Sequence, residues 1–418
     1  MNRRSIKLKW STEFAIAILF FGPQINYYIA ALLSMNGKQT LTTPIYALLF
    51  IIGILSYFKT LRYKTGFFTF ALLCLSLLFS SLINGQVTQY MFSGNLFSSS
   101  ITVMLLVYVP VFLLMLVDVD FRLLWDHFRR FSYVTLILSF LAFGGYLFAH
   151  RTTPPDYMSF AYMMLNPILI CFICGTEGKH LDLILSLLGS FIILIVGCRG
   201  AVITLAVFFA LYVIGFYIPR GGNKHGLSKI VAILGIIAVA VFSDQILTAI
   251  SYGLNSIGFT SRTVNKLIAG GGAFIESEGR QSIWKQAINN IGFLGKGLFG
   301  DRTVILDEYA HPAYAHNFVL EILVDFGWII GLVLVVLLAN LFVRAVRSAL
   351  TSESTVLVKL TFAMIGIIFA KHMISTSFLT SFDFWFYLGL AANLVVNREA
   401  VAEGYYRTGY RDVQNEQI

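Results

Sequence analysis

Long runs of apolar residues, separated by short polar segments, recur along the chain. Several approach about 20 residues, the length that crosses the hydrocarbon core of a bilayer as a helix. The runs are continuous, whereas the strands of a transmembrane barrel alternate over about 10 residues. The chain is 57% hydrophobic and 12% charged, against about 25% charged residues in a soluble domain. The pattern therefore predicts an all-α, polytopic integral membrane protein.

The apolar runs predict twelve transmembrane helices and one long loop. Most Lys and Arg residues fall in the termini and in alternate short loops, so both termini are expected in the cytoplasm. We divide the chain into an N-terminal bundle (1–250), an external loop (251–315), C-terminal helices (316–396) and a cytoplasmic tail (397–418). The predicted spans are Thr12–Leu33, Thr43–Phe58, Gly66–Ile83, Ser98–Val117, Phe131–Ala149, Tyr157–Gly175, Leu181–Gly197, Ala201–Ile218, Ile230–Ile250, Asp325–Val343, Val356–Ile374 and Phe382–Val396.

Charge and cysteine content narrow the class further. The net charge is +9. In a membrane protein such an excess of Lys and Arg reflects the orientation of the loops across the membrane and does not indicate a nucleic-acid partner. Cys171 and Cys174 form a CxxC pattern inside a predicted span, where two small buried side chains are expected more than a redox pair. The first apolar run lacks an Ala-x-Ala cleavage site, so we expect it to stay as a span.

Ionisable residues gather in the polar stretch from 262 to 331. Within it, the segment 281–291 predicts an amphipathic helix on the membrane surface. The glycines that follow indicate a tight, irregular loop and give only a weak phosphate-loop signal. The apolar face of the helix would carry Ile283, Trp284, Ala287, Ile288 and Ile291, and the glycines stand at 292, 295, 297 and 300.

Two arginines on the same predicted side of the membrane are candidate phosphate ligands. Arg199 stands between two spans with almost no loop, where an arginine at the bilayer centre would cost about 2.5–3.5 kcal/mol. It could snorkel to headgroups, or its guanidinium fork could bind phosphate oxygens. Arg280 alone would be an ordinary surface charge. Together, the two could converge on one diphosphate.

His316 and Asn317 stand at the entrance of the tenth predicted span. A histidine can accept a proton near neutral pH, and Glu321 or Asn317 could orient its ring. His311 is the second candidate base. Gly327 and Gly331 form a GxxxG pattern, which usually indicates close helix packing.

Taken together, these motifs resemble the bacterial O-antigen ligase and O-antigen polymerase superfamily. Their order and their common side of the membrane are more specific than any one motif, although many relatives carry Ser at the position of Cys198. The matching residues are Gly197, Cys198, Arg199 and Gly200, then Gly279, Arg280 and Trp284, then Gly295, Lys296 and Gly297, and finally His316, Asn317 and Gly327.

The resemblance implies a glycosyltransferase of the bacterial inner membrane whose active site faces the periplasm. Its donor would be a glycan on undecaprenyl diphosphate, with no cofactor and no metal, and the reaction would invert the anomeric carbon. Arg199 and Arg280 would hold the diphosphate, and His316 would deprotonate or orient the acceptor hydroxyl. His311, Asn317 and Glu321 are further candidates for substrate binding. A chain-length regulator is a possible partner beside the bilayer and the glycolipid acceptor.

The resemblance leaves the acceptor open. A polymerase passes the growing glycan to the next lipid-linked repeat unit, and a ligase passes it to lipid A-core; we favour polymerase. A transporter or flippase would also fit twelve spans, but such proteins usually show repeat symmetry and midplane polar sites. A structural component of an export complex is a weaker alternative.

Overall fold

The computed structural model describes residues 11–34, 43–92, 99–117, 119–150, 156–217, 278–307, 309–352 and 354–396, with a few isolated residues between 248 and 256. Most of these residues are helical, and they include no β-strand. The main helices are α1 (Thr12–Ser34), α2 (Thr43–Thr60), α3 (Lys64–Ile83), α4 (Val87–Met91), α5 (Ser100–Val103), α6 (Val109–Met115), α7 (Phe121–Gly145), α8 (Tyr157–Gly175), α9 (His180–Val196), α10 (Arg199–Tyr212), α16 (Glu278–Asn289), α17 (Phe318–Thr351), α18 (Thr355–Ile365), α19 (His372–Ile374) and α20 (Phe382–Val396).

The all-helical prediction for a membrane protein is confirmed. In the part of the chain that the structure describes, six helices are long and apolar enough to cross a membrane, and five further apolar helices are shorter. The predicted boundaries of the sixth span, Tyr157–Gly175, coincide with α8. The ninth predicted span lies outside the described residues, so the count of twelve and the external position of the loop stay predictions.

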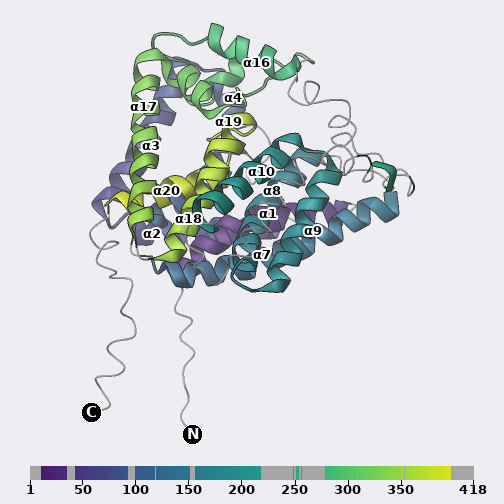
Figure 1. Cartoon of the computed structure of the whole chain (residues 1–418). Helices are drawn as coiled ribbons and strands as arrows, with labels where there is room; N and C mark the ends of the chain where they lie inside the picture. The colour runs from purple at the N-terminus through teal and green to yellow at the C-terminus, as the bar shows by residue number, and fades with distance from the viewer. Residues whose placement is uncertain are drawn as a thin grey trace, which may run out of the picture.

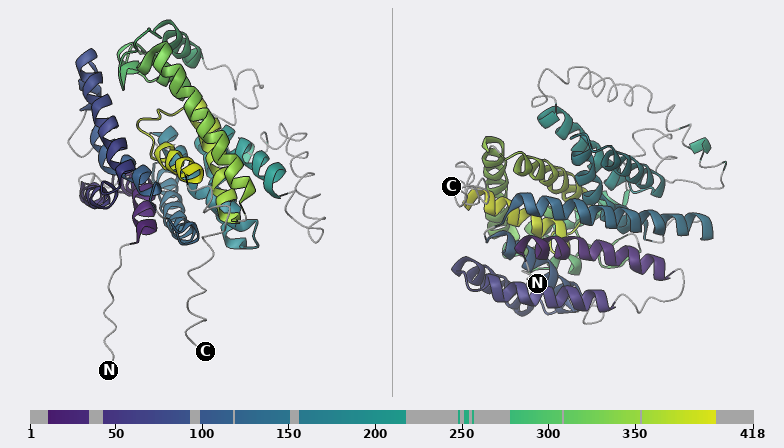
Figure 2. Two further views of the ribbon diagram at one scale, coloured as in Figure 1. Left: turned by 90° about the vertical axis from the view of Figure 1, so that its left-hand side faces the viewer. Right: turned by 90° about the horizontal axis from the view of Figure 1, so that it is seen from below.

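The core is built from helices that pack side by side (Figures 1 and 2). Helix α1 packs against α7, α7 against α8, and α8 against α9, while α20 lies against α6. Aromatic rings fill the centre: Phe20 stacks on Phe128 with ring centroids 5.0 Å apart. At one end, Arg129 binds Asp182 through two hydrogen bonds of 3.2 and 2.8 Å, which joins α7 to α9.

The cysteine prediction is also confirmed. Cys171 and Cys174 are both buried in α8, and both are free thiols. Their neighbours are the apolar side chains of the main core. The CxxC pattern is therefore part of helix packing.

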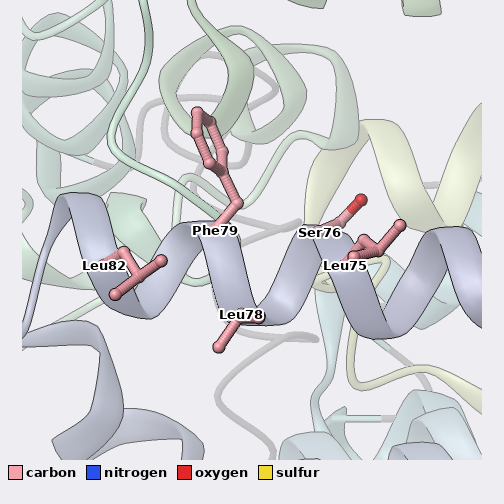
Figure 3. A pocket seen from close by; sticks show the side chains of 5 residues that line it. All are labelled: Leu75, Ser76, Leu78, Phe79 and Leu82. Atoms are coloured by element: carbon pink, nitrogen blue, oxygen red, sulfur yellow. The ribbon is translucent and has the colours of Figure 1, made fainter.

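Helix α3 exposes much more apolar surface than the helices of the core. Leu75, Leu78, Phe79 and Leu82 line a shallow apolar pocket together with Ser76 (Figure 3). The three leucines and Phe79 are all exposed, as expected for a helix whose side chains face lipid.

The end of α3 is fixed to the polar loop that follows α16. The backbone N–H of Leu298 donates to Ser80 Oγ (2.7 Å), and Asn84 Nδ2 donates to Thr303 Oγ1 (3.2 Å). An added Cβ on Gly297 would lie 2.8 Å from the Ser80 side chain. The loop therefore lies directly against the helix that carries the apolar pocket.

Helix α16 confirms the predicted amphipathic helix, but protein covers much of its apolar face. Ile283 and Ala287 are buried in a small cluster with Ile305, Ala315 and Val324. Ile288 remains exposed. The helix is thus anchored on the loop and on α17, and is not held by a membrane surface alone.

Helix α17 breaks at Gly327, which has φ 77° and ψ 178°. This conformation favours glycine, and a Cβ there would lie 2.4 Å from the carbonyl oxygen of Phe293. A Cβ on Gly295 would likewise meet the backbone of Asp325 and Gly327. Glycine is therefore needed both at position 295 in the loop and at position 327 in the break of α17, because the two backbones meet there.

The expectation of close helix packing at Gly327 and Gly331 holds only for Gly331, which packs across the break in α17. Gly327 contacts the loop, and Gly331 lies near Ile322 and Leu323 in the first part of the same helix. The sequence pattern could not show this, because the break at Gly327 depends on the loop that crosses it.

Candidate active site

The start of α17 places His316 and Asn317. Asn317 is the N-cap: its Oδ1 accepts hydrogen bonds from the N–H groups of Val319 (3.0 Å) and Leu320 (3.1 Å), and its Nδ2 donates to the carbonyl of Met373 (3.1 Å). Both groups of the amide are therefore used to fix the helix end. His316 has φ 52°, a left-handed conformation that turns the chain just before the cap.

The His316 ring is oriented by the backbone of Ser375. Its Nδ1 lies 3.0 Å from that carbonyl oxygen. Because a carbonyl oxygen only accepts, Nδ1 carries the proton and Nε2 keeps a lone pair. Nε2 has no hydrogen-bond partner among the described residues. This corrects the expectation that Glu321 or Asn317 orients the ring.

Tyr314 packs beside His316 and shares its acceptor. The two rings have centroids 4.0 Å apart, and Tyr314 Oη donates to the same Ser375 carbonyl (2.7 Å). Burial, with smaller contributions from the charges of Arg280 and Arg302, lowers the pKa of His316 to about 4, although the hydrogen bond to the Ser375 carbonyl opposes this shift. His316 is therefore neutral at pH 7 and able to accept a proton.

Arg280, in the first turn of α16, lies within electrostatic range of this imidazole. Its positive charge acts electrostatically on His316 and Tyr314, and also on Tyr162 and Cys198. Cys198 is the residue before Arg199, so the structure brings the surroundings of both candidate arginines together. Arg280 makes no ion pair with a carboxylate of the described residues.

Arg199 is the first residue of α10 and is partly buried. The next residue, Gly200, packs against Tyr162 of α8 and lies near Ser375: an added Cβ would be 2.0 Å from Tyr162 Oη and 3.7 Å from the Ser375 side chain. The residue that orients His316 therefore also borders the start of α10.

The turn formed by residues 373–378 is the common support of these groups. Its backbone accepts hydrogen bonds from Asn317 and Tyr314 and contacts His316, as described above. At its far end, the N–H of Phe378 donates to Glu321 (3.1 Å), and Ser377 Oγ donates to the same carboxylate. Glu321 is thus buried and used to hold this turn onto α17.

A second charged group, Asp301, Arg302, Glu321 and Asp325, pins the loop to α17; we name it the loop anchor. Arg302 lies 2.8 Å from Asp301 and 3.6 Å from Glu321. Asp301 also accepts from the N–H of Ala315 (3.0 Å), and Asp325 accepts from the N–H of Asp301 (3.0 Å). Each of these acidic side chains is buried and has a donor.

Burial and the neighbouring charged groups both shift the pKa values of side chains in the loop anchor. Burial raises the pKa of Asp301, although Arg302 opposes this. For Arg302, burial alone would lower the pKa, but the neighbouring carboxylates outweigh it and raise the value. The guanidinium also lies over the Phe299 and Tyr314 rings, at 4.9 and 5.6 Å from their centroids. The loop anchor therefore contacts Tyr314, which packs beside His316.

Three carboxylates of the loop anchor have the spacing of a metal site. Ligand atoms of Asp301, Glu321 and Asp325 lie within 4.8 Å of one another. The sequence did not predict this cluster, because its members are far apart along the chain. Backbone N–H groups and the Arg302 guanidinium already satisfy these oxygens, so the donor set is explained without a metal.

His311 is placed differently from His316. Its side chain is 73% exposed and lies 3.6 Å from the Asp307 carboxylate. The N–H of His311 donates to the same residue (2.8 Å) in a tight turn. In the described part of the chain, no hydrogen bond, ion pair or ring contact joins the His311 ring to Arg280 or His316.

A buried ion pair lies behind Tyr162. Lys371 and His372 both bind Asp383, the latter at 3.1 Å, and all three are buried. Lys371 Nζ stands 5.5 Å from the centroid of the Tyr162 ring. A charge in an apolar bundle needs such a partner, and Asp383 supplies it here.

Several residues of this site had no visible signal in the sequence. Tyr162 resembled one more aromatic side chain of an apolar span, and Ser375 acts through its backbone. Tyr314 and Arg302 lay within the polar stretch but matched no motif. Only the fold shows that they meet around His316.

Comparison with known proteins agrees with the sequence resemblance. Residues 184–336 match the family described as O-antigen ligase, and this region contains Arg199, Arg280 and His316. The resemblance to the O-antigen ligase and polymerase superfamily is thereby confirmed, and that family implies glycosyltransferase-type activity on lipid-linked glycans. No curated protein matches the chain.

Proposed function

We propose that the chain is an O-antigen polymerase, which joins undecaprenyl-diphosphate-linked repeat units on the periplasmic face of the bacterial inner membrane. The observation that carries the proposal is the neutral, oriented His316 beside Arg280, in the region that matches the family. Ligation of the glycan to lipid A-core is the second candidate, because the matching family is described by that activity.

In this proposal the two arginines bind the leaving group. A guanidinium fork matches the oxygens of a diphosphate, and its charge is permanent. Arg280 has no described carboxylate partner that would compete with a phosphate. We assign Arg199 to the same diphosphate because its neighbour Cys198 lies within electrostatic range of Arg280 and its neighbour Gly200 packs against Tyr162.

His316 would accept the proton of the acceptor hydroxyl through Nε2. The hydroxyl oxygen forms the new bond to the anomeric carbon while the bond from that carbon to the diphosphate oxygen breaks. The electron pair of the broken bond stays on the diphosphate, and attack from the opposite face inverts the anomeric carbon. A diphosphate beside Arg280 would offset the positive charge that lowers the pKa of His316, so the bound donor would make the imidazole a stronger base.

The remaining candidates take supporting roles. Asn317 and Glu321 position the start of α17 and the 373–378 turn, so they would bind substrate only indirectly. The polyprenyl tail would lie in a lipid-facing groove, for which the apolar pocket of α3 is a candidate, because α3 is fixed to the loop. The chemistry proposed here needs no cofactor and no metal, and a chain-length regulator would act as a separate partner.

Complementation tests the proposed activity. A strain that lacks the gene and carries the wild-type chain should display a ladder of glycan lengths on lipid A-core. A strain with His316→Ala should show at most one repeat unit and should accumulate lipid-linked donor. A complete absence of attached glycan, with long lipid-linked polymer present, would identify a ligase instead.

Cysteine labelling tests the predicted side of the membrane. Gln281 is exposed on α16, and the native cysteines are buried except Cys74, which is partly exposed. In a Cys74→Ser background, Gln281→Cys should react with an impermeant maleimide in spheroplasts. Reaction only after lysis would place the loop in the cytoplasm and reverse the topology.

A further inference from the structure

The first turn of α10 lacks a side-chain cap. Cys198 is the N-cap residue, but its thiol accepts no capping hydrogen bond, and the first helical bond is from Val202 N to Cys198 O. The N–H groups of Gly200 and Ala201 have no acceptor of normal geometry among the described residues, although both lie near the Cys198 sulfur. An uncapped helix start presents donors and the positive end of the helix dipole.

The hydroxyl of Tyr162 points at this turn and has no hydrogen-bond partner. Tyr162 is 6% exposed, and its Oη is buried without a partner in the described part of the chain. Ser375 and the Cys198 sulfur both lie near the hydroxyl, but neither forms a hydrogen bond of normal geometry with it. A buried hydroxyl without a hydrogen-bond partner is unfavourable, unless a bound group supplies that partner.

Positive charge surrounds the same place. Arg280 acts electrostatically on the Tyr162 hydroxyl and on Cys198. Lys371 lies under the Tyr162 ring, but Asp383 holds its ammonium group. No described carboxylate makes a hydrogen bond with Tyr162 or with the first turn of α10. Donors and cations therefore meet where the described residues supply no acceptor except Ser375 and the weakly accepting Cys198 sulfur.

We infer that the first turn of α10 and the Tyr162 hydroxyl form an anion subsite, which binds one phosphate group of the diphosphate leaving group. This inference rests on the proposed function. The N–H groups of Gly200 and Ala201 and the O–H of Tyr162 would donate to phosphate oxygens. The arginines would then bind the remaining oxygens, so the diphosphate would be held by neutral donors on one side and by guanidinium groups on the other.

Tyr162→Phe tests the subsite because it removes one oxygen atom and keeps the ring over Lys371. The purified variant in nanodiscs should melt at the same temperature as the wild type or higher, since the lost hydroxyl had no partner. Its Kd for undecaprenyl diphosphate should rise about 10- to 100-fold, as expected for a hydrogen bond to a charged group. Only a ligand-binding role predicts unchanged stability together with weaker binding.

Tyr212→Phe is the matched control. Tyr212 lies at the other end of α10, is fully buried, and its hydroxyl lies 3.1 Å from Thr176 Oγ1. This variant should bind undecaprenyl diphosphate with the wild-type Kd. An equal loss of binding in both variants would show a general effect of the helix and would contradict the subsite.

A double-mutant cycle tests the geometry. An added Cβ at position 200 would lie 2.0 Å from Tyr162 Oη but 3.2 Å from Cζ. Gly200→Ala should therefore weaken binding strongly in the Tyr162 background and much less in the Tyr162→Phe background. Equal effects in both backgrounds would show that the hydroxyl does not lie against the first turn of α10 and would contradict the subsite.

The remaining outcomes separate this inference from the proposed function. Wild-type binding of undecaprenyl diphosphate, unchanged in Tyr162→Phe, would overturn only the subsite. A Tyr162→Phe chain that fails to fold would also overturn it, because the hydroxyl would then be structural. Equal affinity for phosphatidylglycerol would indicate a phospholipid headgroup site. A wild-type chain that binds no diphosphate, whether lipid-linked or inorganic pyrophosphate, would remove the donor of the proposed function itself.

Discussion

The loop anchor and the His316 site are neighbours, yet their charges are used in opposite ways. In the loop anchor every acidic side chain has a donor, and Arg302 lies between Asp301 and Glu321. In the His316 site, by contrast, three groups lack such a hydrogen-bonding or ionic partner among the described residues. They are His316 Nε2, the Tyr162 hydroxyl and the Arg280 guanidinium. Satisfied buried charges hold structure, whereas unsatisfied donors and acceptors indicate where a substrate binds. Mutations in the loop anchor should therefore reduce stability, whereas mutations in the His316 site should reduce transfer.

Arg302→Met should have the largest effect, because it leaves the Asp301 and Glu321 carboxylates buried without their cation. Breaking such a group typically costs about 3–5 kcal/mol, so the protein level and the melting temperature should both fall. Asp301→Asn in the same chain should restore part of the loss. Normal abundance of the single variant would show that the loop anchor does not hold the fold.

His316→Ala should leave abundance unchanged and reduce transfer by about 10²–10⁴-fold, the usual contribution of a positioned base. His316→Gln keeps a hydrogen-bonding group but cannot take the proton, so it should be nearly as slow. Rates are measured as repeat units added to lipid-linked donor.

His311→Ala is the matched control for this prediction. Its ring is exposed and paired with Asp307, so the variant should keep the wild-type rate. If the His311 variant is inactive and the His316 variant is active, the base is His311 and not His316. Near-normal activity of His316→Gln would limit His316 to orienting the acceptor.

Arg199→Lys and Arg280→Lys should each reduce transfer by about 10- to 100-fold, because the charge remains but the bidentate fork is lost. Both proteins should fold normally, in contrast to Arg302→Met. Arg302→Lys provides the comparison within the loop anchor. Wild-type rates in both site variants would mean that these arginines serve only as membrane anchors.

The pH dependence should be the smallest effect. Burial lowers the pKa of His316 to about 4, so kcat/KM should stay level below pH 6.5 and fall only as the pH approaches about 4. Between these values the unfolded chain binds more protons at this histidine, so stability should decrease as the pH falls. An acidic limb centred near pH 6.5 would show that His316 is exposed to water.

The sequence predicted the parts of this architecture that depend on local pattern. The apolar run Tyr157–Gly175 gave the ends of α8, and the spacing of Ile283 and Ala287 gave an amphipathic α16. It also identified Arg199, Arg280 and His316, because charge and histidine are conspicuous beside apolar spans. These signals need no knowledge of the tertiary structure.

The parts that it missed depend on contacts between distant segments. The break at Gly327 requires the backbone of the loop near Gly295, and the ring of His316 is oriented by a carbonyl 59 residues away. A backbone acceptor such as Ser375 leaves no trace in the side-chain pattern. Tyr162 was indistinguishable from a core aromatic until its hydroxyl was seen to lack a partner.

Transfer by the purified chain tests the central claim most directly. Wild type, Arg280→Lys and Arg302→Lys are placed in nanodiscs with lipid-linked repeat unit, and mass spectrometry counts the glycan products and the undecaprenyl diphosphate released. The account predicts one diphosphate released for each new glycosidic bond in the wild type, and a folded Arg280→Lys variant that is at least about ten-fold slower. Movement of the lipid-linked glycan without bond formation, or an Arg280→Lys rate equal to that of the wild type, would contradict it.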